Sequence, residues 1–311
     1  MSRLARIAGF GALFFAFFVI GLILTFPMGL VSRVIEAQAE EALGFDYDVE
    51  IERVRFSGIV GVKLIGVTLE STAPLREGEV RLPTEIDAVR VRVNPLSLLS
   101  GTPSVRAVVQ VDDGRIRVGY GGHEDGTAID VNFEALEMSS LDIIRQSTGM
   151  PMQGALSGTV RLEYDDENRL AGGNIDLAIP QFIIGPGHIR NEEALRQVGG
   201  SIPIGAANLG PTAIRMPIDG STVSVEEFSA AGSDIRIDAT GRIELRDPMR
   251  ASRVAVSMTL ALDEGFVEAN ALGSPLGMVP VLQRAQTRDG YALMMSGLLG
   301  NLRLDVATGL R

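Results

Sequence analysis

The chain has 311 residues, a formal net charge of −11, no cysteine and no tryptophan. The absence of cysteine excludes disulfides, thiol nucleophiles and thiolate metal sites together. The acidic charge argues against nucleic acid as a partner, because the chain would repel phosphate groups instead of displacing their counterions. The length is sufficient for one elongated domain or two small ones beyond an apolar N-terminal segment.

That segment begins directly after Arg3 and Arg6. Residues 7–26 carry no charge and are mostly Phe, Leu, Ile and Ala. At about 1.5 Å rise per helical residue they would cross a hydrocarbon core of about 30 Å. We therefore predict a transmembrane helix over residues 7–27. Its apolar anchor includes Ile7, Phe14, Phe15, Phe17, Phe18, Leu22 and Phe26.

A cleaved signal peptide is the competing interpretation of the same segment. A signal peptide usually has an apolar core of about 7–15 residues, followed closely by a pair of small residues. Here the run is longer, and Pro27 and Met28 follow it. A retained anchor is therefore favoured. By the positive-inside rule, Arg3 and Arg6 would hold residues 1–6 in the cytoplasm and place the body across the membrane, in the periplasm of a bacterium.

Residues 28–44 continue with apolar side chains at helical spacing and Arg33, Glu36 and Glu40 between them. This spacing predicts a juxtamembrane amphipathic helix that ends near Gly44. The helix would lie near the membrane surface or pack on the domain that follows.

From residue 45 onward the period of the apolar residues changes from 3.6 to 2, which predicts strands. Clean alternation favours an antiparallel sheet with one wet face over a parallel sheet buried on both faces. In one strand the alternation changes phase at Ile65 and Gly66. The alternating residues include Val49, Ile51, Val62, Leu64, Val67, Leu69, Val89, Val91, Val93, Val105, Val109, Ile116, Val118, Val160, Leu162, Ile175, Leu177, Val223, Val225, Ile235, Ile237, Val254, Val256, Leu302 and Leu304.

A hairpin is predicted where two alternating segments flank Asp112, Asp113 and Gly114. Asp-Gly is a common turn pair, and we expect Gly114 to have a positive φ. Short helices are predicted near residues 95–100, 141–148, 191–198 and 275–284.

The predicted fold is mainly β: an elongated, curled antiparallel sheet over residues 45–311 with a few short helices. Two arrangements remain open. The apolar face could close on itself as a sandwich or barrel, or form an open curled sheet with an apolar inner wall. Periodicity alone does not separate them.

Catalytic and metal-binding patterns are sparse. The two histidines, His123 and His188, lie in glycine-containing segments without a nucleophile or metal motif. Asp165, Asp166 and Glu167 lack the ligand spacing of a calcium loop and fit a solvated hairpin tip better. We therefore expect no catalytic, cofactor-binding or metal site, and a protein that is not an enzyme.

The order of segments resembles the type II secretion system protein N family in its long form. The resemblance rests on residues 89–101, where a strand runs into an N-P-L-S-L-L-S-G turn, and on residues 154–164, 170–179 and 290–306. More distantly, the chain resembles the AsmA and TamB class of membrane-anchored β-rich proteins. The family-like turn consists of Asn94, Pro95, Leu96, Leu98, Leu99 and Gly101.

The first resemblance implies a non-catalytic accessory or assembly component of type II protein secretion, anchored in the inner membrane and contacting other secretion components. The second implies a curled sheet with an apolar groove that binds or transfers phospholipid. A continuous, accessible apolar wall would favour lipid handling, whereas a closed core would favour a scaffold.

Overall fold

The described part of the chain is built almost entirely from one antiparallel sheet. The computed structural model describes residues 33, 35–37, 47–57, 61–72, 83–95, 97, 102–123, 126–141, 145, 150–189, 202–272 and 280–307. A 16-stranded sheet contains most of them, and a separate two-stranded sheet contains β10 and β11. The mainly β fold with few short helices is therefore confirmed.

The strands are β1 (Tyr47–Phe56), β2 (Gly61–Ser71), β3 (Thr84–Val93), β4 (Ser104–Val111), β5 (Gly114–His123), β6 (Gly126–Glu137), β7 (Met152–Gln153), β8 (Ala155–Tyr164), β9 (Leu170–Ile184), β10 (Gly187–Ile189), β11 (Ile202–Ile204), β12 (Ala207–Asp219), β13 (Thr222–Ala231), β14 (Ile235–Glu244), β15 (Arg253–Leu262), β16 (Gln286–Thr287), β17 (Gly290–Leu298) and β18 (Asn301–Val306).

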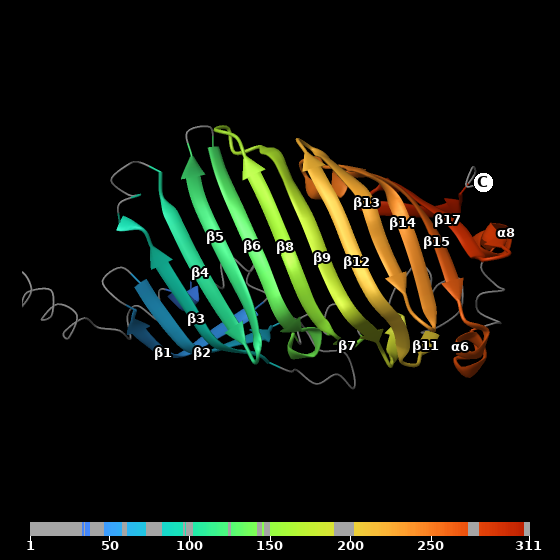
Figure 1. Cartoon of the computed structure of the whole chain (residues 1–311), viewed down its shortest axis with the longest axis horizontal. Helices are drawn as coiled ribbons and strands as arrows, with labels where there is room; N and C mark the ends of the chain where they lie inside the picture. The colour runs from blue at the N-terminus through green and yellow to red at the C-terminus, as the bar shows by residue number, and fades with distance from the viewer. Residues whose placement is uncertain are drawn as a thin grey trace, which may run out of the picture.

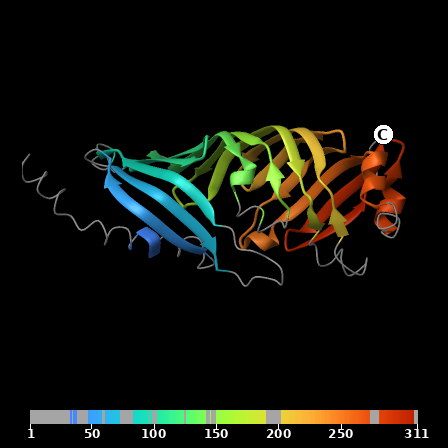
Figure 2. The ribbon, with the colours of Figure 1, turned by 90° about the horizontal axis from the view of Figure 1, so that it is seen from below.

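The order of strands in the sheet follows the order of the chain. Each long strand pairs with the long strands before and after it, and β1 and β18 each pair with a single strand. Short hairpins can make such a meander because no crossover is needed. The sheet bends into an arch, with β1–β3 at one end and β15–β17 at the other curving away behind the central strands (Figures 1 and 2).

The predicted phase slip in β2 is confirmed. Gly66 has a φ of 61°, in the left-handed region, and the buried positions change parity there from Leu64 to Val67. β1 changes parity at the same level, from Ile51 to Val54. The slip therefore keeps the apolar residues of both strands on one face.

The predicted hairpin between β4 and β5 is also present, but its turn residues were misassigned. Asp112 has the positive φ, 48°, and Gly114 already pairs with Val111 as the first residue of β5. Glycine is needed at position 114 because β6 lies close: a Cβ there would be 2.8 Å from Leu136 Cα. Ser140 donates a hydrogen bond to the Asp112 carboxylate.

The buried core is concentrated near the two ends of the arch. At one end, a cluster around Val54, Leu64 and Val67 holds β1 to β3. At the other, one cluster joins β12 and β13 to Phe266, and another joins β13 to β15 through Val225, Val254 and Val256.

The helices lie at the ends or the rim of the sheet. Those that the structure describes from end to end are η1 (Met138–Ser140), η2 (Met249–Ala251), α6 (Glu264–Ala269) and α8 (Pro280–Ala285). The sequence did not predict α6, although Asp263 caps it by accepting hydrogen bonds from the N–H groups of Gly265 and Phe266. α8 overlaps the predicted helix over residues 275–284.

Residues 33 and 35–37 are helical, and Ile35 packs against the β1–β3 cluster. Glu36 Oε1 accepts a hydrogen bond from the N–H of Ile51 at 3.1 Å. This part of the predicted amphipathic segment therefore contacts the sheet. Of the other predicted helices, Pro95, Ser97 and Arg145 are helical, and residues 191–198 lie outside the described residues. Among the residues that the structure describes, no helix is long and apolar enough to cross a membrane.

Candidate functional site

A continuous apolar face runs across the whole sheet. In an antiparallel sheet, directly opposed residues of neighbouring strands point to the same face. The pairing therefore defines rows of side chains that cross the strands. One row takes a single residue from each long strand, namely Val54, Leu64, Val89, Val109, Ile116, Phe133, Gly158, Leu177, Ile214, Phe228, Ala239, Met258, Leu293 and Val306. We call the face that carries this row the apolar face.

A neighbouring row has the same character. It consists of Phe56, Val62, Val91, Ala107, Val118, Val131, Val160, Ile175 and Met216. The two rows cross the sheet side by side, so the apolar face is a continuous surface and not a set of isolated clusters.

One position of the first row, Gly158, carries no side chain, and the reason lies in the backbone. Gly158 has a φ of 139°, and a Cβ there would lie 2.1 Å from the carbonyl oxygen of Asp176 on β9. No side chain fits at this close approach, so Gly158 lies opposite Phe133 without interrupting the apolar character of the row.

The middle of the apolar face is not covered by any helix that the structure describes. The buried clusters contain residues of β1–β3 and of β12–β15, and α6 and α8 lie at the β17 end of the arch (Figure 1). Between them, the apolar side chains of β4, β5, β6, β8 and β9 in both rows are half-buried. Tyr120, on the same face, is 37% exposed.

The two faces of these central strands differ in exposure. On the apolar face Ile116, Val118 and Val160 are half-buried, whereas on the opposite face Arg117 and Thr159 are exposed. Side chains converge on the inside of a bent sheet and spread apart on its outside. Because no described helix covers these strands, we infer that the apolar face is the concave side of the arch.

The opposite face, which we call the polar face, carries exposed ion pairs. Arg117 contacts Glu134 on the next strand, and Arg161 Nε lies 2.8 Å from Glu163 Oε1. Such exposed pairs contribute at most about 1 kcal/mol each. The polar face therefore exposes charged side chains to solvent, whereas the apolar face carries half-buried hydrophobic ones. The two faces differ in chemistry as well as in exposure.

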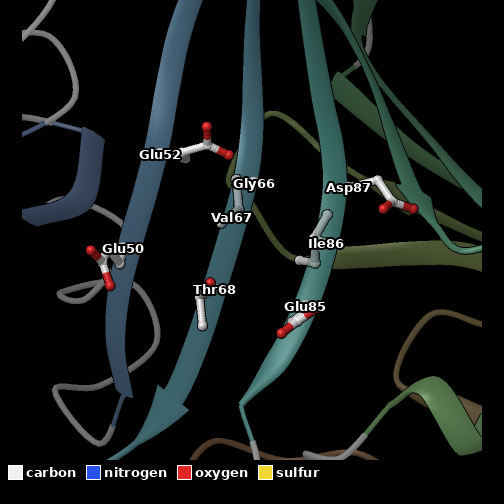
Figure 3. Close-up of a pocket in the computed structure, with 8 residues that line it drawn as sticks. All are labelled: Glu50, Glu52, Gly66, Val67, Thr68, Glu85, Ile86 and Asp87. Atoms are coloured by element: carbon white, nitrogen blue, oxygen red, sulfur yellow. The ribbon is translucent and has the colours of Figure 1, made fainter.

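The polar face also has an acidic hollow over β1 to β3. Glu50, Glu52, Glu85 and Asp87 line it together with Gly66, Val67, Thr68 and Ile86, and its volume is about 370 Å³. Figure 3 shows Glu52 of β1 and Asp87 of β3 on either side of Gly66. Among the described residues, no three carboxylates or histidines converge closely enough to hold a metal ion.

The residues singled out from the sequence fall mostly outside the described part. Arg3, Arg6 and the anchor residues Ile7, Phe14, Phe15, Phe17, Phe18, Leu22 and Phe26 lie there, as do Leu96, Leu98, Leu99 and Gly101 of the family-like turn.

Asn94 and Pro95 are described, and they connect β3 to β4 through Ser97, which is not among the turn residues expected from the sequence. The Ser97 hydroxyl donates to Asn94 O at 2.7 Å and accepts from the N–H of Ser104 at 2.9 Å. Ser97 is buried and closes the turn. A serine inside a leucine-rich turn is the only signal in the sequence that could have indicated this role.

Comparison with known proteins gives no match to this chain among family models, curated proteins or solved structures.

Proposed function

We propose that this protein holds the acyl chains of phospholipids on the concave apolar face of its sheet. The observation that carries the proposal is the half-buried apolar surface over β4 to β9, which no described helix covers. Soluble proteins rarely leave a contiguous apolar surface of this kind without a ligand or partner.

The dimensions and the chemistry of this surface suit an acyl chain. Five strands with a spacing of about 4.8 Å give an apolar width on the order of 20 Å across β4, β5, β6, β8 and β9. Each methylene group removed from water would contribute about 0.8 kcal/mol to binding. Valine, isoleucine and leucine present no polar group that would require a specific headgroup, so the recognition would be for the tail.

The predicted membrane anchor and the resemblance to the AsmA and TamB class support the same proposal. In it, the chain is a single-pass inner-membrane protein whose periplasmic body binds or transfers lipid and performs no catalysis. The acidic charge of the chain keeps the body from adhering electrostatically to anionic lipid, so contact with the bilayer would come from the anchor.

An accessory role in type II protein secretion remains a second proposal. It is supported by the exposed last strand of the sheet, where Leu302 and Leu304 are each 39% exposed. An exposed edge can accept a strand from a protein partner. A scaffold of this kind could retain a lipid-binding fold, so the two proposals are compatible.

One pair of variants tests the lipid proposal with the same substitution on the two faces. Val109 lies on the apolar face opposite Val89 and Ile116, whereas Val108 lies on the polar face opposite Arg90 and Arg117. A glutamate at position 109 would put a charge in the path of an acyl chain, but at position 108 it would meet two arginines.

The measurement is the amount of phospholipid that co-purifies with the full-length chain, determined by mass spectrometry after extraction. We expect Val109→Glu to retain several-fold less lipid than the unsubstituted protein and Val108→Glu to retain the same amount. Lipid bound around the anchor is common to all three and cancels in the comparison. Equal retention by both variants, with both folded by circular dichroism, would rule out the apolar face as the binding surface.

A further inference from the structure

The last strand of the sheet, β18, has an exposed edge. It pairs with β17 and with no other described strand, and Asn301 to Asp305 are all exposed. Leu302 and Leu304 lie on the apolar face, and Arg303 and Asp305 lie on the polar face. Within the part of the chain that the structure describes, Arg303 and Asp305 have no ion-pair partner. Such an edge readily pairs with another strand.

The register with β17 shows which backbone groups point outward. Asn301 pairs with Leu298 across the two-residue turn of Leu299 and Gly300. Beyond the strand, the N–H of Ala307 donates to Ala292 O at 3.1 Å. Hydrogen-bonded pairs alternate along an antiparallel ladder, so the odd-numbered residues of β18 face β17. The N–H and C=O groups of Leu302, Leu304 and Val306 therefore point away from the sheet.

The sequence of this edge is complementary to itself. When two copies of β18 run antiparallel with Leu304 opposite its own copy, Arg303 lies opposite Asp305 of the partner subunit, and the converse pair forms by symmetry. Leu302 then lies opposite Val306 of the partner subunit on the apolar face. A shift of two residues in either direction would instead put Arg303 opposite Arg303 of the partner subunit, or Asp305 opposite Asp305 of the partner subunit.

We propose that a second copy of this chain pairs with β18 in this register. The outward groups of Leu302, Leu304 and Val306 would exchange about six backbone hydrogen bonds with those of the partner. Opposite charges in directly opposed positions favour the pairing, and like charges oppose the shifted registers. A two-fold axis through the Leu304 pair gives an isologous contact, which closes as a dimer and cannot extend into a fibre.

The pairing would join the two sheets into one. Because opposed residues share a face, the apolar face of one copy would continue into that of the other through Leu302 and Leu304. α8 precedes β16, whose Gln286 pairs with Tyr291 beyond the Val306 end of β18, and α8 contacts β18 there. Asn301 to Asp305 are exposed in spite of that contact, so α8 leaves these five residues of the strand uncovered. The proposal rests on the edge itself and stands whether or not the apolar face binds lipid. A dimer formed in this way would occupy the β18 edge, so a secretion partner could not add a strand there at the same time.

Cysteine cross-linking tests the register, because the chain has no cysteine of its own. In a hydrogen-bonded antiparallel pair the two Cα atoms are about 5.5 Å apart, within disulfide range. Leu304→Cys in the full-length chain, oxidised in isolated membranes, should give a disulfide-linked dimer. Leu302→Cys is the matched control, since Leu302 has the same 39% exposure. The two copies of residue 302 would lie on the order of 13 Å apart, too far for a disulfide.

Charge exchange in the Leu304→Cys background tests the ion pairs. Arg303→Asp should lower the yield of dimer at least several-fold, because two pairs of carboxylates would face each other, and Asp305→Arg should do the same. The double exchange, with Arg303→Asp and Asp305→Arg together, should restore the yield. Equal dimer from Leu302→Cys and Leu304→Cys, no dimer from either, or a double exchange that stays monomeric would each overturn the proposal.

Discussion

The carboxylate of Glu52 lies over the backbone of Gly66, where β1 and β2 change phase together. A Cβ on Gly66 would be 2.7 Å from Glu52 Oε2 and 3.0 Å from Glu52 Cβ. Gly66 also has a φ of 61°. The side chain of one strand therefore occupies the space that the glycine of the next strand leaves open.

Gly66→Ala should destabilise the protein. An alanine in the left-handed region costs about 1–2 kcal/mol, and displacement of the Glu52 side chain adds to that cost. The measurement is thermal unfolding by far-ultraviolet circular dichroism, since the chain has no tryptophan to report by fluorescence. Gly121→Ala is the control, because a Cβ there has nothing within 4 Å. A melting temperature unchanged in Gly66→Ala would show that the phase slip tolerates a side chain.

Gly114→Val should destabilise the hairpin of β4 and β5 because the valine side chain has no room there. A positive φ is not the reason, since Gly114 does not have one. The added side chain would collide with the backbone of β6, where a Cβ lies 2.9 Å from Ala135 O. Overpacking of this kind costs about 1–3 kcal/mol. Gly119→Val on the same strand is the comparison, since its Cβ would make ordinary contacts at 3.8 Å. Similar melting temperatures for the two variants would argue against a close approach of β6.

Asp165 lies at the hairpin tip between β8 and β9. We expect it to make the free energy of unfolding depend on pH. The hydrogen bond from the backbone N–H of Arg169 lowers the pKa of Asp165, and the Arg169 guanidinium and the N–H of Glu167 act in the same direction. A carboxylate with a depressed pKa in the folded state stabilises the protein above its unfolded pKa, about 3.9. That contribution is lost as the pH falls through the folded pKa.

Asp165→Asn should therefore lower the melting temperature at pH 7, and the difference from the unsubstituted protein should shrink below about pH 4. Asp166→Asn is the control, because the described residues give Asp166 no hydrogen bond or ion pair. A difference that stays constant from pH 7 to pH 3 would show that the charge of Asp165 is not what stabilises the tip.

Local alternation in the sequence predicted most strands but not how they are combined. The phase slip at Gly66 was recognisable because Val62, Leu64, Val67 and Leu69 are all apolar on a single strand. Gly114 was misinterpreted because its constraint comes from β6, a neighbour that sequence spacing does not reveal. β6, β12 and β17 were missed, although Ile129, Val131 and Phe133 alternate in the first of them.

The candidate site could be predicted only in outline. The sequence showed that each strand has one apolar face, which left an open sheet and a closed core equally compatible with it. Whether Val131 or Val160 is covered depends on elements far away in the chain. The cross-strand rows depend on register, which bulges such as the one near Ala135 shift by a residue at a time.

Photo-cross-linking from the apolar face in intact membranes tests the lipid proposal most directly. A benzophenone amino acid at Phe133 replaces one aromatic ring by a larger one at the centre of the apolar face, and the same group at Thr159, on the polar face, is the control. We expect irradiation to attach phospholipid to the chain labelled at position 133 and not to the chain labelled at position 159. Phospholipid attached equally at both positions, or at neither, would contradict the account.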